Sequence, residues 1–167
     1  GAQSPTRVER SVPDGQKAEG VIINGVECEP YRASDYRTML ERAEMVLTGT
    51  EIVMRAVGVE RAVIGVENNK PDAIKHLREV IARDGYRGIE VMPLKMRYPQ
   101  GGEKQLIAAV TGRQVPPPPA LPISVGAVVC NVSTCVAIYE AVQKNKPLIE
   151  RVVTVTGKHL NSTHNYL

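Results

Sequence analysis

Short apolar runs alternate with longer amphipathic stretches along most of this 167-residue chain. Four runs rich in Val and Ile predict buried strands, because they are short and bounded by polar or Gly-containing segments. These runs cover residues 21–26, 61–66, 89–94 and 127–130. Elsewhere apolar residues recur at intervals of three and four, which predicts helices. The predicted helices cover residues 33–56 with a break near Gly49, residues 71–83, the stretch after Gly102, and residues 134–144.

This alternation of strand and helix predicts an α/β fold. A Rossmann-like, mostly parallel sheet with helices on both faces and right-handed crossovers is the arrangement that buries every apolar run. A closing run at 152–156 predicts a last strand, and the prolines at 116–119 and 122 predict a stiff linker. We expect the α/β domain to cover residues 21–157, after a polar opening segment at 1–20. Residues 158–167 read as a tail or the start of a following module.

Polar side chains follow the first predicted strand. Asn24, Glu27 and Glu29 come directly after its apolar residues, and Pro30 ends regular structure there. Ligands of open α/β sheets bind outside the carboxyl ends of the strands. These three residues are therefore candidates for a binding cleft, although a strand-end turn with solvated acids would have the same pattern.

Two predicted helices begin with residues suited to an anionic ligand. Gly101 and Gly102 precede Glu103 and Lys104 where a polar loop becomes a helix, and a helix N-terminus offers free N–H groups. The second helix begins with a polar group: Asn131, Ser133 and Thr134. Such side chains either cap the helix or help to hold a phosphate, and the spacing alone leaves both open.

Composition narrows the classes of function. A net charge of +3 with interleaved acids and bases gives no reason to expect nucleic-acid binding. No apolar run approaches the roughly 20 residues of a membrane span, so direct membrane insertion is not expected. The three cysteines, Cys28, Cys130 and Cys135, contain no CxxC pair, which favours reduced thiols over a disulfide framework or a metal site. No cysteine or histidine constellation predicts a catalytic residue.

Four segments together resemble a known family. They are residues 24–31 (NGVECEPY), 67–71 (ENNKP), 98–106 (YPQGGEKQL) and 131–134 (NVST), and the closing ERVVTVTG at 150–157 also fits. Their order and spacing are similar to the flavin-binding domain of RnfC-type electron-transport subunits. The same domain occurs in the NADH-oxidising flavoprotein subunit of respiratory complex I. The resemblance covers nearly the whole chain.

The resemblance implies a cofactor, a donor and a set of partners. The cofactor would be FMN, with NADH as electron donor, and iron–sulfur clusters would lie only in downstream regions. The partners would be other subunits of a redox complex, with a cytoplasmic location that is peripheral to the membrane through those subunits. Asn131, Ser133 and Thr134 would hold the FMN phosphate.

The remaining site residues implied by the resemblance surround the ring system and the dinucleotide. Asn24, Glu27 and Glu29 would line the isoalloxazine and nicotinamide side. Gly101 and Gly102 would lie against the dinucleotide, Glu103 would accept hydrogen bonds from it, and Lys104 is the weaker candidate for phosphate pairing. Tyr98 is a further cofactor-binding candidate. Such a site requires no general base, since a flavin performs the redox step itself.

The opening segment departs from the family pattern. Members carry a glycine-rich loop of the form GGAGFPT that leads into a lysine, whereas residues 1–6 read GAQSPT and Arg10 stands near the lysine position. Gln and Ser tolerate close backbone approach less well than Gly. Two functions therefore stay open: an FMN-binding module that accepts electrons from NADH, and a flavin-free scaffold in a multisubunit redox complex. Whether the chain is itself an enzyme component depends on the flavin.

An ordinary Rossmann dehydrogenase is not supported. That class needs G-x-G-x-x-G after the first strand, followed by an acid at the end of the second. Glu67 does end the second predicted strand, but the first is followed by Asn-Gly-Val-Glu-Cys-Glu-Pro.

Overall fold

A four-stranded parallel sheet forms the centre of the computed structural model, which describes residues 17–28, 33–155 and 164–166. The strand order is β3-β2-β1-β4, and all three neighbouring pairs are parallel. The strands are β1 (Gly20–Gly25), β2 (Ala62–Glu67), β3 (Ile89–Leu94) and β4 (Ala127–Asn131). Each lies within one residue of the bounds that the apolar runs predicted. The departures from the glycine-rich loop, at residues 1–10, lie outside the described residues.

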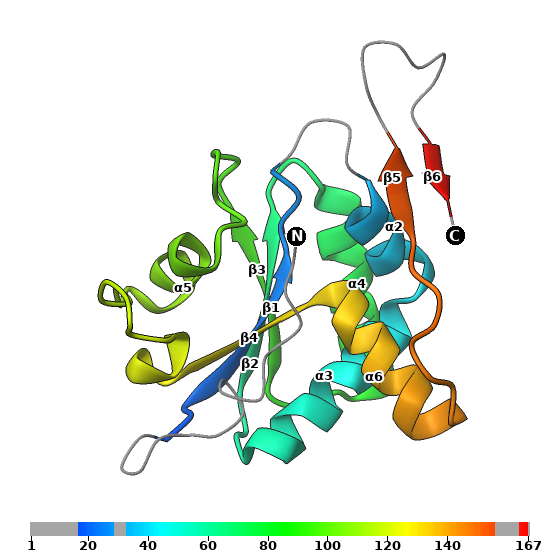
Figure 1. The fold of residues 1–167 in the computed structure, drawn as a ribbon. Helices are drawn as coiled ribbons and strands as arrows, with labels where there is room; N and C mark the ends of the chain where they lie inside the picture. Colours follow the sequence, from blue (N-terminus) through cyan, green and yellow to red (C-terminus); the bar gives the residue numbers. More distant parts are fainter. Residues whose placement is uncertain (1–16, 29–32, 156–163, 167) are drawn as a thin grey trace.

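Helices cover both faces of this sheet, as Figure 1 shows. On one face lie α2 (Ser34–Glu41), α3 (Ala43–Val57), α4 (Pro71–Asp84) and α6 (Val132–Lys144). On the other lie α5 (Glu103–Thr111) and the short 3-10 helix η1 (Pro122–Val125). The predicted fold class is therefore confirmed. The larger core contains Ile23, Leu47 and Leu77, and the smaller one contains Leu106 and Ile107.

The inner and edge strands of the sheet differ in composition. Every residue of the inner strand β2 is buried, whereas the edge strand β3 alternates and contains Pro93, which lacks the N–H that an inner strand needs. Arg78 of α4 donates a hydrogen bond from Nη2 to the Val91 carbonyl oxygen at 3.0 Å. A charged side chain over an edge strand discourages pairing with another chain.

The long helix predicted at 33–56 is in fact two helices, and the position of the break was predicted wrongly. α2 ends before Arg42 and α3 begins after it, so Gly49 lies inside α3. A Cβ at Gly49 would overlap the backbone carbonyl of Cys135 in α6. Gly49 therefore allows two helices to approach closely, and it does not break one.

The closing strand does not join the parallel sheet. β5 (Val153–Val155) pairs antiparallel with β6 (His164–Tyr166) in a separate two-stranded sheet. Exposed apolar side chains gather along this end of the chain: Leu148, Ile149, Val152, Val153, Val155 and Tyr166. Within the part of the chain that the structure describes, no helix is both long and apolar enough to cross a bilayer.

Candidate functional site

The strand order reverses direction between β1 and β4. The chain moves outward from β1 through β2 to β3, and then crosses back to place β4 on the other side of β1. Asn24 and Asn131 are register partners at the carboxyl ends of these two strands. A crevice outside such a switch point is where open α/β sheets bind ligands. The sequence predicted both residues for the site, and the fold brings them together.

Asn131 is held in place by three hydrogen bonds of its side chain. Its Oδ1 accepts from the Ser133 backbone N–H at 2.8 Å, which caps α6. Its Nδ2 donates to Asp35 Oδ2 at 2.8 Å and to the Asn24 carbonyl oxygen at 3.3 Å. Both amide protons are therefore used within the protein, and Asn131 caps α6. Its predicted contact with a phosphate stays a prediction.

Asp35 is a site residue that the sequence reasoning missed. It belongs to α2, it is 2% exposed, and its Oδ1 accepts a hydrogen bond from Ser133 Oγ at 2.9 Å. The carboxylate thus lies against the first turn of α6, where the helix dipole stabilises negative charge. The sequence did contain an indication that Asp35 is buried. Asp35 precedes the buried Met39 by one helical turn, so both residues lie on the same face of α2.

Thr134 is the predicted phosphate ligand whose hydroxyl is not already used. Ser133 donates its hydroxyl proton to Asp35, whereas no hydrogen bond of the Thr134 side chain occurs among the described residues. Thr134 is half-buried in the first turn of α6. Its hydroxyl and the nearby helix N–H groups are the donors that remain for a ligand.

Glu27 turns towards α2 and away from open solvent. Its carboxylate accepts from the backbone N–H groups of Asp35 at 2.7 Å and Tyr36 at 3.0 Å, and it thereby caps the start of α2. Lys70 Nζ lies 3.1 Å from Glu27 Oε2 and 3.5 Å from Glu67 Oε2. Glu29 lies outside the described residues. Its predicted role, like that of Glu27 towards a ligand ring, stays a prediction.

Glu67 is the last residue of β2, lies beside Glu27 and Lys70, and is 1% exposed. Its Oε2 is the oxygen near Lys70, while its Oε1 has no hydrogen-bond partner among the described residues. Lys70 therefore lies between two buried carboxylates, and these two ion pairs connect the ends of β1 and β2. Burying a charge is costly unless it is paired, so Lys70 is important to this end of the sheet.

The loop before α5 is joined to β1 by the Asn24 side chain. Asn24 Nδ2 donates to the Gly101 carbonyl oxygen at 3.0 Å. Gly102 is the N-cap of α5 and offers no capping side chain, so the first turn of α5 presents backbone N–H groups near the end of β1. A Cβ at Gly101 would lie 3.1 Å from the Val26 carbonyl oxygen, so packing within the protein already favours a glycine here.

The other predicted residues of this loop are exposed to different degrees. Tyr98 is 78% exposed and Glu103 is exposed at the start of α5. Lys104 Nζ donates to the Pro116 carbonyl oxygen at 2.9 Å, so its side chain reaches towards the proline-rich linker. The role of Lys104 towards a phosphate stays a prediction.

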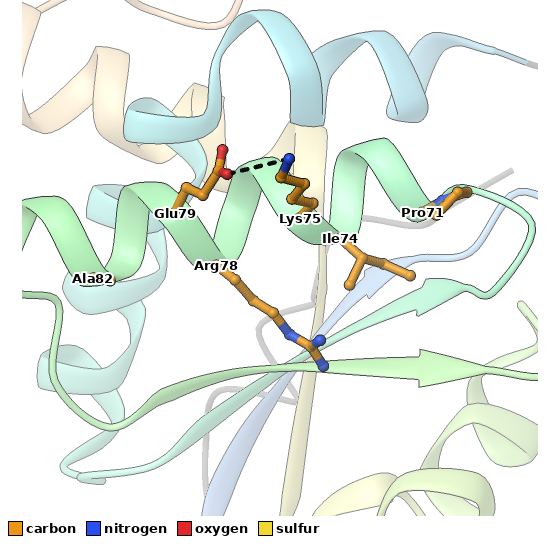
Figure 2. Close-up of a pocket in the computed structure, with 6 residues that line it drawn as sticks. All are labelled: Pro71, Ile74, Lys75, Arg78, Glu79 and Ala82. Carbon is orange, nitrogen blue, oxygen red and sulfur yellow. Dashed lines mark ion pairs between the residues drawn. The ribbon is translucent and has the colours of Figure 1, made fainter.

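A groove along α4 contains none of the predicted site residues. Figure 2 shows its lining, with Lys75 and Glu79 joined in an ion pair at 3.8 Å and the Arg78 side chain extended towards β3. The groove is lined by Pro71, Ile74, Lys75, Arg78, Glu79 and Ala82. Its charged groups are used locally, and we assign no ligand to it.

The three cysteines lie in the apolar cores or pack against them. Cys130 and Cys135 are buried, and Cys28 is half-buried. Burial raises the pKa of the Cys135 thiol to about 12, with the neighbouring Cys130 adding to the shift. Cys135 is therefore a neutral thiol at ordinary pH, consistent with the reduced structural role expected from the sequence.

The donors at the switch point fit an anionic, nucleotide-like cofactor. The Thr134 hydroxyl and the first turn of α6 lie on one face of the sheet, and the first turn of α5 lies on the other. The Asp35 carboxylate, in contrast, opposes an anion. The donors are what a phosphate requires, and the polar strand ends suit a heteroaromatic ring with hydrogen-bonding edges.

Comparison with known proteins identifies a family. The family model described as the Nuo51 FMN-binding domain matches residues 1–140. Over its full length, the chain is 45% identical to a subunit of the proton-translocating ferredoxin:NAD(+) oxidoreductase complex of Clostridium ljungdahlii. It is 47% identical, over 94% of its length, to a subunit of the Na(+)-translocating ferredoxin:NAD(+) oxidoreductase complex of Acetobacterium woodii.

The chain spans about a third of these two relatives, 36% and 35% of their lengths. Among solved structures, a crystal structure of NAD+-reducing [NiFe]-hydrogenase in the H2-reduced state matches 75% of this chain and 24% of its own. The TM-score is 0.67 at 25% sequence identity. The fold and the family model therefore agree with the resemblance found in the sequence.

Proposed function

Because the chain belongs to the Nuo51 FMN-binding domain family, we propose that it binds FMN non-covalently at the switch point between β1 and β4. We further propose that it accepts electrons from NADH as the flavin-binding part of an RnfC-like subunit. Bound FMN supplies the hydride and electron-transfer chemistry, and the protein supplies binding, orientation and the local charge. The observation that carries this proposal is the family match over residues 1–140, together with free donors at that point of the fold.

Thr134 is the side chain that would receive the FMN phosphate. Its hydroxyl is not used by the described residues, and it lies in the first turn of α6, where N–H groups and the helix dipole favour an anion. Asn131 holds this turn in place through its cap of Ser133. The phosphate contact would therefore rest on one hydroxyl and on backbone N–H groups.

The loop before α5 would form the wall of the proposed FMN site that lies opposite the first turn of α6. Asn24 fixes the Gly101 carbonyl oxygen, which holds the loop beside the end of β1. Gly102 offers no capping side chain to the first turn of α5. The exposed Tyr98 and Glu103 would then face NADH, which approaches from solvent during turnover.

The partners follow from the names of the relatives. Proteins 45% and 47% identical to this chain are subunits of ion-translocating ferredoxin:NAD(+) oxidoreductase complexes. We propose that this chain likewise works beside other subunits of a redox complex. It would be peripheral to the membrane, and its iron–sulfur clusters would lie in regions that follow this domain.

A flavin-free scaffold is the second candidate, and one observation favours it. The two Asn131 amide protons and the Ser133 hydroxyl proton are used by Asp35 and Asn24. A domain that no longer bound a phosphate would gain from such internal pairing. FMN binding separates the two candidates directly.

The test is titration of the 167-residue chain with FMN, followed by quenching of flavin fluorescence. We expect saturable binding at one site per chain, weakened about tenfold or more in Thr134→Ala, because a phosphate hydrogen bond is charge-assisted. The matched control is Thr111→Ala, which removes a hydroxyl that contacts the α5 backbone and the adjoining Arg113 N–H. Absence of FMN binding by the parent chain would favour the scaffold.

A further inference from the structure

Glu67 carries a buried carboxylate oxygen that receives no hydrogen bond. The residue is 1% exposed, its Oε2 lies 3.5 Å from Lys70 Nζ, and its Oε1 has no hydrogen-bond partner among the described residues. Burying an acceptor without a donor costs free energy, so native proteins rarely keep such an atom unless a ligand, an ion or an ordered water supplies the donor. The place of Glu67 in the sheet decides which kind of donor fits.

Glu67 lies at the edge of the sheet where ligands of this fold class bind. It is the last residue of β2, and β2 pairs with β1. Ligands of open α/β sheets sit outside the carboxyl ends of the strands. Glu67 is therefore one strand away from the switch point between β1 and β4, and it contributes an acceptor to the same edge of the sheet.

The Glu67 side chain leaves β2 on the face that α5 covers. Side chains two residues apart on a strand share a face, and a Cβ at Gly65 would meet Leu94 of the smaller core. Leu94 is also the register partner of Glu67. Asn24 is the register partner of Gly65, and its amide reaches the Gly101 carbonyl oxygen in the loop before α5. Glu67 and Asn24 thus point to the same face at the ends of neighbouring strands.

We propose that Glu67 is a ligand-binding residue whose Oε1 accepts a hydrogen bond from an uncharged N–H group on a planar heterocycle. This inference rests on the proposed function, which supplies two such donors: the ring N3–H of the FMN isoalloxazine and the carboxamide of NADH. The heterocycle lies outside the ends of β1 and β2, and Glu67 contacts its polar edge. A binding role thereby falls to β2, which contributes none of the cofactor-binding residues predicted from the sequence.

The charges around Glu67 favour an uncharged donor over a second cation. Lys70 already places its ammonium group 3.5 Å from Glu67 Oε2 and 3.1 Å from Glu27 Oε2, and another cation beside it would be repelled. Among the described residues, no group of three or more His, Cys, Asp or Glu side chains is arranged to hold a metal ion. A carboxylate accepts hydrogen bonds and forms strong ones with N–H donors. Because Oε1 is closed to solvent, a ligand reaches it only after neighbouring side chains move.

The experiment pairs a change in the protein with a change in the ligand. The parent chain, Glu67→Gln and Glu67→Met are titrated with FMN and with FMN methylated at ring N3, which has no N–H at that position. A parallel series uses NADH and its analogue that carries an acetyl group in place of the carboxamide. The two series distinguish the flavin ring from the nicotinamide as the source of the donor.

We expect methylation at N3 to weaken FMN binding to the parent about tenfold or more, since a hydrogen bond to a charged acceptor is lost. In Glu67→Met the two forms of FMN should bind within about threefold of each other, because the acceptor is gone. Glu67→Gln keeps a neutral acceptor and should show a smaller penalty than the parent. Such coupling between a ligand atom and a side chain reports direct contact, and a merely structural role for Glu67 would not produce it. The same coupling in the NADH series would assign the donor to the carboxamide.

Glu90→Gln is the matched control, since Glu90 is an exposed carboxylate on β3 that pairs with Arg61 at 3.4 Å. It should leave the ligand penalties of the parent unchanged. Chemical denaturation checks that each variant is folded, and the comparison of ligands on the parent chain requires no substitution at all.

The inference is overturned if neither ligand pair shows a penalty in the parent, or if the penalty persists in full in Glu67→Met. Parental binding of FMN without either coupling leaves the proposed function standing and removes only the role of Glu67. Coupling in the NADH series by a chain that binds no FMN supports Glu67 and contradicts FMN binding. A chain that binds neither FMN nor NADH overturns both.

Discussion

The Asn24 side chain at the end of β1 donates a hydrogen bond of 3.0 Å to the carbonyl oxygen of Gly101, 77 residues further along the chain. Its Oδ1 accepts from the Val26 backbone N–H at 3.1 Å. One half-buried amide thus closes the turn after β1 and holds the loop before α5. This pair joins two of the segments that the sequence singled out.

The first prediction concerns the stability of that connection. Asn24→Ala removes both hydrogen bonds, and we expect the free energy of unfolding to fall by about 1–3 kcal/mol. Chemical denaturation measures the change, and hydrogen exchange should become faster at the Gly102 amide. Asn69→Ala is the control, because the exposed Asn69 amide contacts the Met96 sulfur at the surface. Equal losses in the two variants would contradict a specific role for Asn24.

The second prediction concerns the cation between two buried carboxylates. Lys70→Met leaves Glu27 and Glu67 without the ion pairs at 3.1 and 3.5 Å, and their side chains are 0% and 1% exposed. We expect a loss of about 3 kcal/mol in the free energy of unfolding, measured by chemical denaturation, because the change removes a cation that pairs with two buried carboxylates.

Lys75→Met is the matched control for Lys70→Met. Lys75 pairs with Glu79 at 3.8 Å on the solvent side of α4, where both side chains are more than half exposed. Such surface pairs contribute about 0–1 kcal/mol. A Lys70→Met protein as stable as the Lys75→Met protein would show that the Lys70 cation does not stabilise the fold around Glu27 and Glu67.

Much of the fold was predictable from the sequence, because burial determines where apolar residues lie. The four parallel strands were predicted to within one residue, since β1, β2 and β4 contain nearly continuous apolar runs that only a covered sheet accommodates, and the edge strand β3 keeps apolar residues on its buried side. The break at Arg42 was missed because nothing in the spacing of apolar residues marks it. Gly49 was misread because its close approach to Cys135 is a tertiary contact.

The position of the candidate site in the fold was predictable from the sequence, whereas the hydrogen-bond partners of its side chains were not. Asn24 and Asn131 meet because each ends a strand next to the switch point, which the alternation of elements implies. Asp35, in contrast, reaches the site from α2, and its partners lie 96 and 98 residues away. Which donors remain free for a ligand depends on such long-range hydrogen bonds, and sequence spacing does not contain them.

The third prediction tests the close contact of α3 with α6. Gly49→Ala places a methyl group against the backbone of Cys135, which cannot move as a side-chain end can. We expect a loss of about 3 kcal/mol or more in the free energy of unfolding, despite the higher helix propensity of Ala. Arg55→Ala, on the exposed face of the same helix, should change it by less than about 0.5 kcal/mol. A Gly49→Ala protein of parental stability would mean that the helices separate easily.

The fourth prediction concerns the thiols. The pKa of Cys135 is raised to about 12 from 9.0, chiefly by burial, so its neutral form is favoured in the folded protein. The stability that this contributes is fully present below pH 9 and is lost as the pH rises towards about 12. At about pH 8, we expect an alkylating reagent to modify the half-buried Cys28 first and to leave Cys135 unmodified until the protein unfolds. Mass spectrometry of peptides decides this, and rapid labelling of Cys135 in the native protein would contradict it.

The last prediction separates ligand contact from folding at Gly102. The backbone of Gly102 has φ −63° and ψ 134°, which any residue adopts, and its Cβ would mainly meet the movable end of Gln105 at 2.5 Å. Gly102→Val should therefore fold, with a loss of about 1 kcal/mol for a poorer helix cap. Its branched side chain would project beside the first turn of α5, so we expect the affinity for FMN or NADH to fall at least about tenfold. Ala109→Val adds bulk on the exposed side of α5 and is the control.

Fluorescence titration measures the affinity of the Gly102→Val chain, and NADH oxidation with a dye acceptor gives the activity of a longer protein that carries the same change. A loss of cofactor contact lowers both the affinity and the activity while the protein stays folded. A loss of folding also lowers both, and chemical denaturation detects it. If Gly102→Val keeps both affinity and activity, the loop does not contact the cofactor. The flavin-free scaffold then becomes the better account of this domain, because the first turn of α5 would no longer contribute to a ligand site.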